Sequence, residues 1–422
     1  MDGDGNPRMA LEHGLDGFGL VFPLPFRVAC VVVAAVWGWA ANLHYLHLMR
    51  IDVPALIRYP ARASASQPPH HVSTYRLASL LSATVAAFLL LFWAVTRRKP
   101  GAVLDHDWIP MSCLFTLAVL FAVPLHRTAL AVPHAGRRRL LATLRRVSVG
   151  GLAEAHNGKF GDILLADVLT SYSRVLADLY VCVCMFLRSG NSAATAPPDR
   201  ACGASLAVPL LLALPYAIRL RQCLTEYLRV RRAPYKESVG WGGQHLANAA
   251  KYATAFPVIA LNAAVRPGAP QTSSRPLLGR AWVAAVLLNS LYSFYWDVAK
   301  DWDLTLLSAR RRAAAPDQPY GLRRRLHLAP GPPAYYAAVA LDLALRCTWV
   351  VRVVGPTADR ASGLEGSIFA LELLEVLRRW VWIFFRVETE HVRNTTTGHG
   401  LAVDDVLLGD YQGKSEEDSE ED

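Results

Sequence analysis

Charged side chains stand in helical register inside a segment that is otherwise apolar enough for a lipid bilayer. Between Leu371 and His391 the sequence reads LELLEVLRRWVWIFFRVETEH. At 100° per residue, one stripe of this segment collects Glu375, Arg378, Arg379, Trp382 and Arg386. Charged groups in a membrane span are costly and usually face a protein interior or water. The stripe therefore predicts contact with other polar groups, whereas the opposite face can meet lipid.

Four further apolar segments carry polar stripes of the same kind. The residues at helical spacing are Asp167, Thr170, Ser171, Arg174 and Asp178 in the first, Asn248, Lys251 and Tyr252 in the second, Ser290, Ser293, Asp297 and Asp301 in the third, and Asp342, Arg346 and Trp349 in the fourth. If these faces converge, they form a polar interior lined by cationic, acidic and aromatic side chains.

Such an interior is suited to an oxyanion. Clustered guanidinium groups in a low dielectric need carboxylates or an anionic ligand to balance their charge. Arg presents paired N–H donors that match phosphate oxygens, and Lys adds a point charge. Asp and Glu can hold the cations while the site is empty, and they can accept hydrogen bonds from a protonated phosphate, which sulfate does not offer. The pattern predicts a site for a phosphate-like anion.

Each stripe also has a purely structural interpretation, in which charges satisfy one another locally or reach water. The alternatives are Arg378 and Arg379 with Glu372 or Glu375, Arg174 with Asp178, Lys251 and Tyr252 at the headgroups, Arg346 with Asp342, and Asp297 with Asp301 in solvent at a helix end. The residues alone leave these alternatives open, although all of them holding at once would require five separate coincidences.

The segments that carry the stripes are predicted to cross a membrane. Of the 422 residues, 53% are hydrophobic and only 18% are charged, a combination outside the range of soluble domains. Nine runs approach the roughly 20 residues that a spanning helix needs: Phe26–Leu48, Leu77–Val95, Met111–Pro124, Ile163–Leu187, Ser205–Leu220, Leu246–Val265, Ala281–Val298, Tyr335–Val354 and Ser367–Phe385. We expect an all-α, polytopic membrane helical bundle with about nine transmembrane helices, between eight and ten.

Membrane topology explains the net charge of +10 better than binding to nucleic acid does, because the basic residues form short clusters between apolar runs. These clusters follow the third, fifth and seventh runs, and the positive-inside rule places them in the cytosol: Arg137–Arg139 with Arg145 and Arg146, Arg219–Lys236, and Arg310–Arg312 with Arg323–Arg325. The N-terminus is then lumenal or external, and the glycosylation sequon at Asn394 is cytosolic and unmodified. Arg97, Arg98 and Lys99 are exceptions to the rule.

One basic segment between the spans has apolar residues at helical spacing. In GRRRLLATLRRVSVGG, Leu140, Leu141 and Leu144 could lie on the cytoplasmic leaflet with the arginines facing lipid phosphates. The alternative is a solvated basic loop.

Other chemistry is weakly represented. Six of the seven cysteines lie in or at the ends of the predicted spans, so we expect apolar fillers and no disulfide framework. His44 and His47 lack partners that would complete a metal site, and the sequence shows no phosphate-binding glycine loop or nucleophile elbow. We expect no enzyme, no catalytic residue, no metal and no cofactor.

Six segments resemble, in this order, the motif blocks of the EXS domain: LLADVLTSY, IRLRQCLTEY, LANAAKYATAF, YSFYWDVAKDWDL, LRCTWVV and LEVLRRWVWIFFRVETEH. That domain occurs in eukaryotic phosphate exporters of the xenotropic-and-polytropic-retrovirus-receptor type and in the fungal ER-retention-defective proteins. The exporters typically have Asn where Thr170 stands. The resemblance implies a phosphate pathway formed by Asp167, Lys251, Tyr252, Asp297, Arg346, Trp349, Glu375, Arg378 and Arg379.

The resemblance also implies a domain order. We expect an N-terminal tail over 1–20, membrane helices and a basic cytoplasmic loop over 21–159, the EXS domain over 160–394 and an acidic cytosolic tail over 395–422. No segment resembles the SPX domain of the exporters, so the chain is similar to the fungal branch.

For that branch, the resemblance implies a transporter of inorganic phosphate from the Golgi lumen to the cytosol, which supports glycosylation and the retention of Golgi and ER residents. The alternative is a sorting partner that binds glycosyltransferases or coat adaptors without transport. The expected location is the Golgi membrane, with cycling to the ER, and the expected partners are inorganic phosphate, membrane lipids and, by analogy, a second copy of the chain.

Overall fold

All regular structure in the described part of the chain is helical. The computed structural model describes residues 7–59, 69–123, 134–154, 157–188, 192–203, 205–232, 242–265, 275–307, 319–323, 325–351 and 364–396. The helices are α1 (Pro7–Gly14), α2 (Gly17–Val21), α3 (Leu24–Leu48), α4 (Val53–Leu56), α5 (His70–Thr96), α6 (Pro100–Asp105), α7 (Trp108–Ala122), α8 (His134–Ser148), α9 (Lys159–Ser171), α10 (Ser173–Leu187), α11 (Ala207–Arg232), α12 (Gly243–Ala253), α13 (Ala255–Val265), α14 (Arg275–Trp296), η2 (Asp297–Asp301), η3 (Pro319–Gly321), α16 (Pro332–Arg346) and α18 (Leu364–Thr396). Apart from Thr395 and Thr396, the expected acidic tail lies outside the described residues.

Five helical segments are long and apolar enough to cross a membrane: Leu24–Leu48, His70–Thr96, Pro100–Ala122, Ala207–Arg232 and Pro276–Asp301. Together, α9 and α10 qualify as a sixth span that is bent by 61°. Large apolar side chains stay uncovered on these helices, with Phe115 72% and Leu288 58% exposed, as lipid-facing residues would be. The expectation of an all-α polytopic bundle is therefore confirmed. The count of nine stays a prediction, because α12, α13 and α16 are short and α18 is rich in charge.

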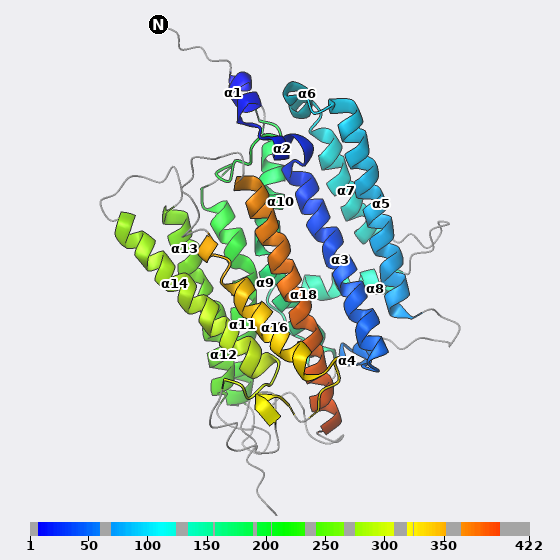
Figure 1. The fold of residues 1–422 in the computed structure, drawn as a ribbon, viewed down its shortest axis with the longest axis vertical. Coiled ribbons are helices and arrows are strands. Elements are labelled where there is room, and N and C mark those ends of the chain that lie inside the picture. The colour runs from blue at the N-terminus through cyan, green and yellow to red at the C-terminus, as the bar shows by residue number, and fades with distance from the viewer. Residues whose placement is uncertain are drawn as a thin grey trace, which may run out of the picture.

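The long helix α18 passes through the middle of the bundle, with α3 on one side and α14 and α16 on the other (Figure 1). Trp380 Nε1 donates a hydrogen bond to the carbonyl of Gly38, and Asn42 Nδ2 donates to the carbonyl of Trp380 at 3.2 Å. A Cβ atom on Gly38 would lie only 3.2 Å from the Trp380 ring. The glycine thus allows α3 and α18 to approach closely and to be tied together at this point.

Four helices end or break where the polar stripes lie. α9 meets α10 at Tyr172, α12 gives way to α13 at Thr254, α14 continues into the π-helical turn η2, and α16 ends at Arg346. Non-helical backbone at membrane depth is tolerated only where it is buried in protein or lines a water-filled cavity, and π-helical turns frequently occur at functional sites. The breaks therefore mark the part of the bundle in which a site is expected.

Cys184 and Cys202 form a disulfide, with their Cα atoms 6.1 Å apart, so the prediction that the cysteines are all unpaired fillers is wrong. The segment after α10 folds back over the end of that helix, and spacing along the sequence does not reveal this return. Thr195 Oγ1 donates to the carbonyl of Val103 and helps to hold the segment in place. Because disulfides persist in oxidising compartments, we infer that this end of the bundle is lumenal, in agreement with the lightly charged loop expected there.

The two ends of α18 give a test of this orientation. Glu365, in its first turn, accepts hydrogen bonds from Arg200, two residues from the disulfide. Asn394 lies about 45 Å further along the helix axis at 1.5 Å per residue, near the opposite end of the bundle. Endoglycosidase treatment is expected to leave the electrophoretic mobility of the protein unchanged, because Asn394 faces the cytosol. A glycan on Asn394 would contradict the orientation, and intact Cys184–Cys202 pairing in unreduced protein serves as the control.

Candidate functional site

Asp297 is fully buried and contacts cations from three other helices. Lys251 Nζ of α12 lies 3.0 Å from Asp297 Oδ1, and Arg378 Nη1 of α18 lies 3.5 Å from Oδ2. Arg346 Nη2, at the end of α16, also contacts Oδ2. The stripes predicted on these four segments therefore do converge, and they meet at one carboxylate.

A second layer of carboxylates completes this network. Asp342 accepts hydrogen bonds from Arg346 Nε and Arg378 Nη1, each at 3.1 Å. Glu375 accepts from Arg378 Nε at 2.8 Å and from Nη2 at 2.6 Å, the paired geometry in which guanidinium binds an oxyanion. The local pairs Arg346–Asp342 and Arg378–Glu375 thus exist, but they are parts of a network that joins α12, η2, α16 and α18.

Lys251 does not reach the headgroups, because it is 7% exposed and also donates to Asp301 at 3.3 Å. The interfacial alternative for this residue is therefore wrong. Asp297 and Asp301 are held by this lysine, so the alternative in which both are simply solvated at a helix end is wrong as well.

Asp167 of α9 is held by a residue that the sequence analysis did not include in the site. Arg219 Nε donates to Asp167 Oδ1 at 2.8 Å and to Tyr252 Oη at 3.1 Å, and Tyr252 in turn donates to Asp167. Placing Arg219 in a cytoplasmic loop was wrong, because α11 continues past Leu220 and buries this side chain. The signal was present in IRLRQCLTEY, where Gln222 and Glu226 follow Arg219 at i+3 and i+7.

Arg379 is bound differently from its neighbour. Its Nε donates to Ser171 Oγ at 2.8 Å, its Nη2 donates to Thr170 Oγ1 at 3.1 Å, and its guanidinium lies 4.6 Å from the centre of the Trp382 ring. Among the described residues no carboxylate is ion-paired with Arg379, and its buried Nη1 has no hydrogen-bond partner. Arg379 therefore retains a donor that an anion could use.

We call the ten interacting ionic residues of this region the charge cluster. They are Lys251, Arg219, Arg346, Arg378 and Arg379 with Asp167, Asp297, Asp301, Asp342 and Glu375. The five cations and five carboxylates cancel formally. In a low dielectric such balance keeps buried charges tolerable, and an incoming anion would disturb it unless a carboxylate were released from its cation.

The polar face of α10 also meets α18, as predicted. Arg174 Nε lies 2.9 Å from Glu372 Oε1, so the predicted local alternative of Arg174 with Asp178 is not the pair that forms. Towards the lumenal end, Glu365 accepts from Arg27 of α3 and from Arg200. Ion pairs therefore connect α18 to its neighbours between the charge cluster and the lumenal end.

Eight of the nine residues predicted for the pathway lie in the charge cluster or, for Tyr252, hydrogen-bond to it. Trp349 is the ninth residue and has no described contact with the charge cluster. Its ring packs at right angles against Trp282 of α14, with the ring centroids 6.5 Å apart. The structure thus places Trp349 beside the site, three residues beyond Arg346, and not within its hydrogen-bond network.

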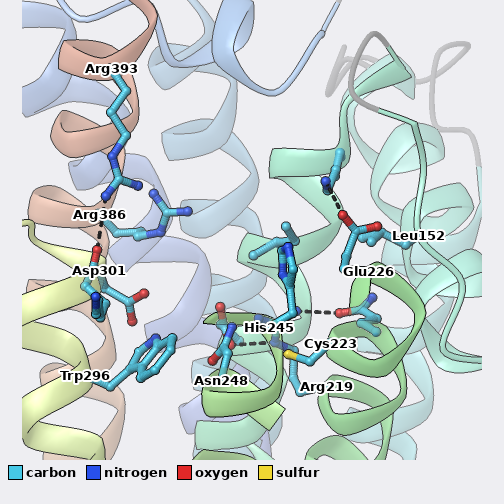
Figure 2. Close-up of a pocket in the computed structure, with 15 residues that line it drawn as sticks. Leu152, Arg219, Cys223, Glu226, His245, Asn248, Trp296, Asp301, Arg386 and Arg393 are labelled. Carbon is cyan, nitrogen blue, oxygen red and sulfur yellow. Dashed lines mark hydrogen bonds and ion pairs between the residues drawn. The ribbon is translucent and has the colours of Figure 1, made fainter. Parts of the chain in front are cut away.

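A cavity of about 60 Å³ borders the charge cluster at Asp301 and Arg219 and continues towards Arg393, near the inferred cytosolic end of α18 (Figure 2). A single water needs on the order of 10–15 Å³ of such space, so the cavity has room for several waters. Its lining is rich in cations and includes Lys159, Arg219, Lys300, Arg386 and Arg393. Asp167 and Asp301 also line it, whereas Arg346, Arg378 and Arg379 do not. The cavity therefore reaches the cytosolic edge of the charge cluster and ends there.

The described residues contain no group of His, Cys, Asp and Glu arranged to hold a metal ion. Cationic donors dominate the cavity and are balanced in the charge cluster, and such a donor set suits an anion better than a cation.

Broken membrane helices around a buried, balanced cluster of ionic residues define a polytopic membrane protein with an interior suited to an anion. The sequence matches the EXS family over residues 22–392, and the chain belongs to this family. The match includes the helices before residue 160 as well as the segment in which the motif blocks were noted.

The chain is similar to Protein ERD1 homolog 1 of Schizosaccharomyces pombe, with 30% identity over 383 residues that cover 90% of this chain and 94% of the relative. It is 27% identical to SPX and EXS domain-containing protein 1 of Dictyostelium discoideum, over 89% of this chain and 38% of that protein. It is 28% identical to Solute carrier family 53 member 1 of Mus musculus, over 77% of this chain and 45% of that protein. The similarity thus spans nearly the whole length of the first relative and less than half of the other two.

The two adjacent arginines of α18 should differ in their effect on stability. Arg378→Gln removes the ion-pair partner of Glu375 and leaves Asp342 with Arg346 alone, and breaking a buried pair typically costs 3–5 kcal/mol. Arg379→Gln breaks no ion pair among the described residues, and loss of its hydrogen bonds to two hydroxyls should cost less, about 1.5–3 kcal/mol. Thermal unfolding of the purified variants in detergent should therefore show a lower Tm for Arg378→Gln. Equal Tm values for the two variants would contradict the pairing described above.

Proposed function

We propose that this protein transports inorganic phosphate across the membrane, from the Golgi lumen to the cytosol, and that it is a carrier and not an enzyme. The observation that carries the proposal is Arg379, a buried arginine with an unused Nη1 donor at the edge of a charge-balanced cluster. An oxyanion with several acceptor oxygens can take this donor and then compete for neighbouring guanidinium groups. Membership of the EXS family and similarity to a member of solute carrier family 53 support a transport function.

Anion binding would proceed by exchange of ionic partners. The cations of the charge cluster are already matched by carboxylates, so a phosphate oxygen must take the place of a carboxylate oxygen on at least one arginine. Glu375 is the member of the cluster best placed to yield, because its side chain is 36% exposed and, among the described residues, its only ion pair is with Arg378. Asp297, which is shared by three cations, would hold the cationic groups together during the exchange.

The two sides of the charge cluster suggest a direction of passage. Glu375 lies on the side of Arg378 that leads to the lumenal end of α18, whereas the cation-lined cavity opens beyond Asp167 and Asp301 towards Arg393 (Figure 2). An anion released from the arginines would enter the cavity and meet further cations there. We infer that the anion passes Glu375 first and leaves through the cavity.

Phosphate flux in proteoliposomes tests this proposal. The purified protein should carry labelled inorganic phosphate, and Arg379→Gln should lower the initial rate at least tenfold, because a hydrogen bond to a charged donor contributes about 1.5–3 kcal/mol. The Tm of this variant should stay close to that of the unchanged protein. Arg188→Gln, which removes a 60% exposed arginine at the lumenal end, is the matched control and should leave the rate unchanged. Undiminished flux in Arg379→Gln would overturn the assigned site.

The proposed location is the Golgi membrane, where recovery of phosphate would support glycosylation and the retention of resident enzymes. Similarity to Protein ERD1 homologs supports this placement. In cells that lack the natural protein, Arg379→Gln should reach the same membrane and fail to restore retention of a Golgi glycosyltransferase. Full retention in the presence of this transport-deficient variant would favour a direct sorting role without transport.

A further inference from the structure

The basic helix α8 lies apart from the charge cluster and has an unusual exposed surface. Leu140 and Leu141 are 40% and 37% exposed, and Arg138 and Arg145 are exposed on the same helix. A helix that combines exposed leucines with arginines is typical of segments that lie in the plane of a membrane interface. The segment is helical from His134 to Ser148, which favours the leaflet-bound alternative over a basic loop and leaves the question of what its exposed residues contact.

Two other arginines of α8 fix the helix to the ends of two neighbouring helices. Arg137 Nη1 donates to the carbonyls of Leu120 and Val123, at the C-terminal end of α7. Arg146 donates through Nε and Nη2 to Asp162 in the first turn of α9, at 2.6 and 2.5 Å. α8 is therefore held across the end of a membrane-spanning segment, and Figure 1 shows it below the lower end of α7.

Arg138 and Arg145 differ, because no described carboxylate is paired with either of them, whereas Arg139 Nη2 donates to the carbonyl of Asn157 at 3.5 Å. Gly136 lies beside Tyr59, and Arg139 lies beside Gly158, so α8 is close to α4 and the start of α9, on the side of the bundle that we have inferred to be cytosolic. The anionic surface of a cytosolic leaflet attracts such residues. Exposed leucines beside them match the boundary between headgroups and acyl chains.

The acidic C-terminal sequence KSEEDSEED is the other occupant to consider. Its carboxylates could neutralise Arg138 and Arg145, and the apolar residues of the preceding LAVDDVLL could cover Leu140 and Leu141, so occupation by this tail is an outcome that the test below must distinguish. Anionic lipid accounts for both kinds of exposed residue.

We propose that α8 binds the headgroups of anionic phospholipids in the cytosolic leaflet. Arg138 and Arg145 contact the headgroup phosphates, while Leu140 and Leu141 enter the upper part of the acyl region. Arg137 and Arg146 hold the helix in place, so the lipid site is attached to the ends of α7 and α9 and does not depend on the anion chemistry of the charge cluster.

The test is lipid binding to the purified full-length protein in neutral detergent. Native mass spectrometry measures the affinity for a phosphatidylinositol phosphate in competition with phosphatidylcholine. The double variant Arg138→Gln with Arg145→Gln should weaken binding of the anionic lipid about 20- to 30-fold, roughly fivefold per arginine. Leu140→Gln with Leu141→Gln should also weaken it. The control, Arg231→Gln with Arg232→Gln, removes the same charge from the exposed end of α11 and should change the affinity less than twofold.

Phosphate flux and Tm are measured for the same variants, so that loss of folding is separated from loss of lipid. Unchanged affinity in both α8 variants would overturn the proposal, as would an equal loss in the α11 control. A protein that shows no preference for the anionic lipid would also overturn it, and this is the result expected if the acidic C-terminal sequence covers the arginines. If neither the unchanged protein nor any variant transports phosphate, the proposed function fails but the lipid result stands, because lipid binding is measured separately.

Discussion

The cost of burying charge within a membrane governs the arrangement of this protein. A single buried ionic group in a bilayer is unfavourable by several kcal/mol, so ionic groups must meet partners from other helices. Asp297 satisfies this requirement for cations of α12, α16 and α18 at once. The helices that supply these partners are consequently held together by ionic contacts deep in the bundle, while their outer faces remain apolar and lipid-facing. Without the shared carboxylate, each of the three cations would keep one or two of the outer carboxylates, but the contact that joins the three helices would be lost and one positive charge would be unbalanced.

Helix breaks and the charge cluster depend on each other. A helix that ends at membrane depth exposes carbonyl groups, and cations near a helix C-terminus interact favourably with that end. Lys251 is in the last turn of α12 and Arg346 is the last residue of α16, so both cations stand where the backbone favours them. Conversely, the cluster provides the polar surroundings without which such breaks would be costly in lipid. The same short region therefore combines interrupted helical backbone with the ionic groups of the charge cluster.

Helical spacing was enough to predict the stripes, because a stripe is a local property of one helix. Their convergence was a hypothesis beside local alternatives, and the structure decided it by bringing Lys251, Arg346 and Arg378 to Asp297. Arg219 was missed because its position just before further basic residues resembled the start of a cytoplasmic loop, and only the continuation of α11 shows that it is buried.

The disulfide was missed because it depends on a loop that folds back over α10. Trp349 was included both by helical spacing, in the stripe with Asp342 and Arg346, and by family resemblance, whereas the structure packs it against Trp282. Partner choice, such as Arg174 with Glu372 instead of Asp178, depends on the relative placement of two helices and is not encoded in the spacing of either one.

The close contact at Gly38 bears on how the protein could move. α18 is continuous for 33 residues and is tied to α3 through Trp380, next to Arg378 and Arg379. Sliding or rotation of α18 would bring the indole against the backbone of α3, so these two helices form a rigid frame. Alternating access would then arise from swinging of the half-helices that end at Tyr172, Thr254 and Arg346. In such a cycle the guanidinium groups of α18 stay in place, while the carboxylates and hydroxyls that face them move into and out of contact with them.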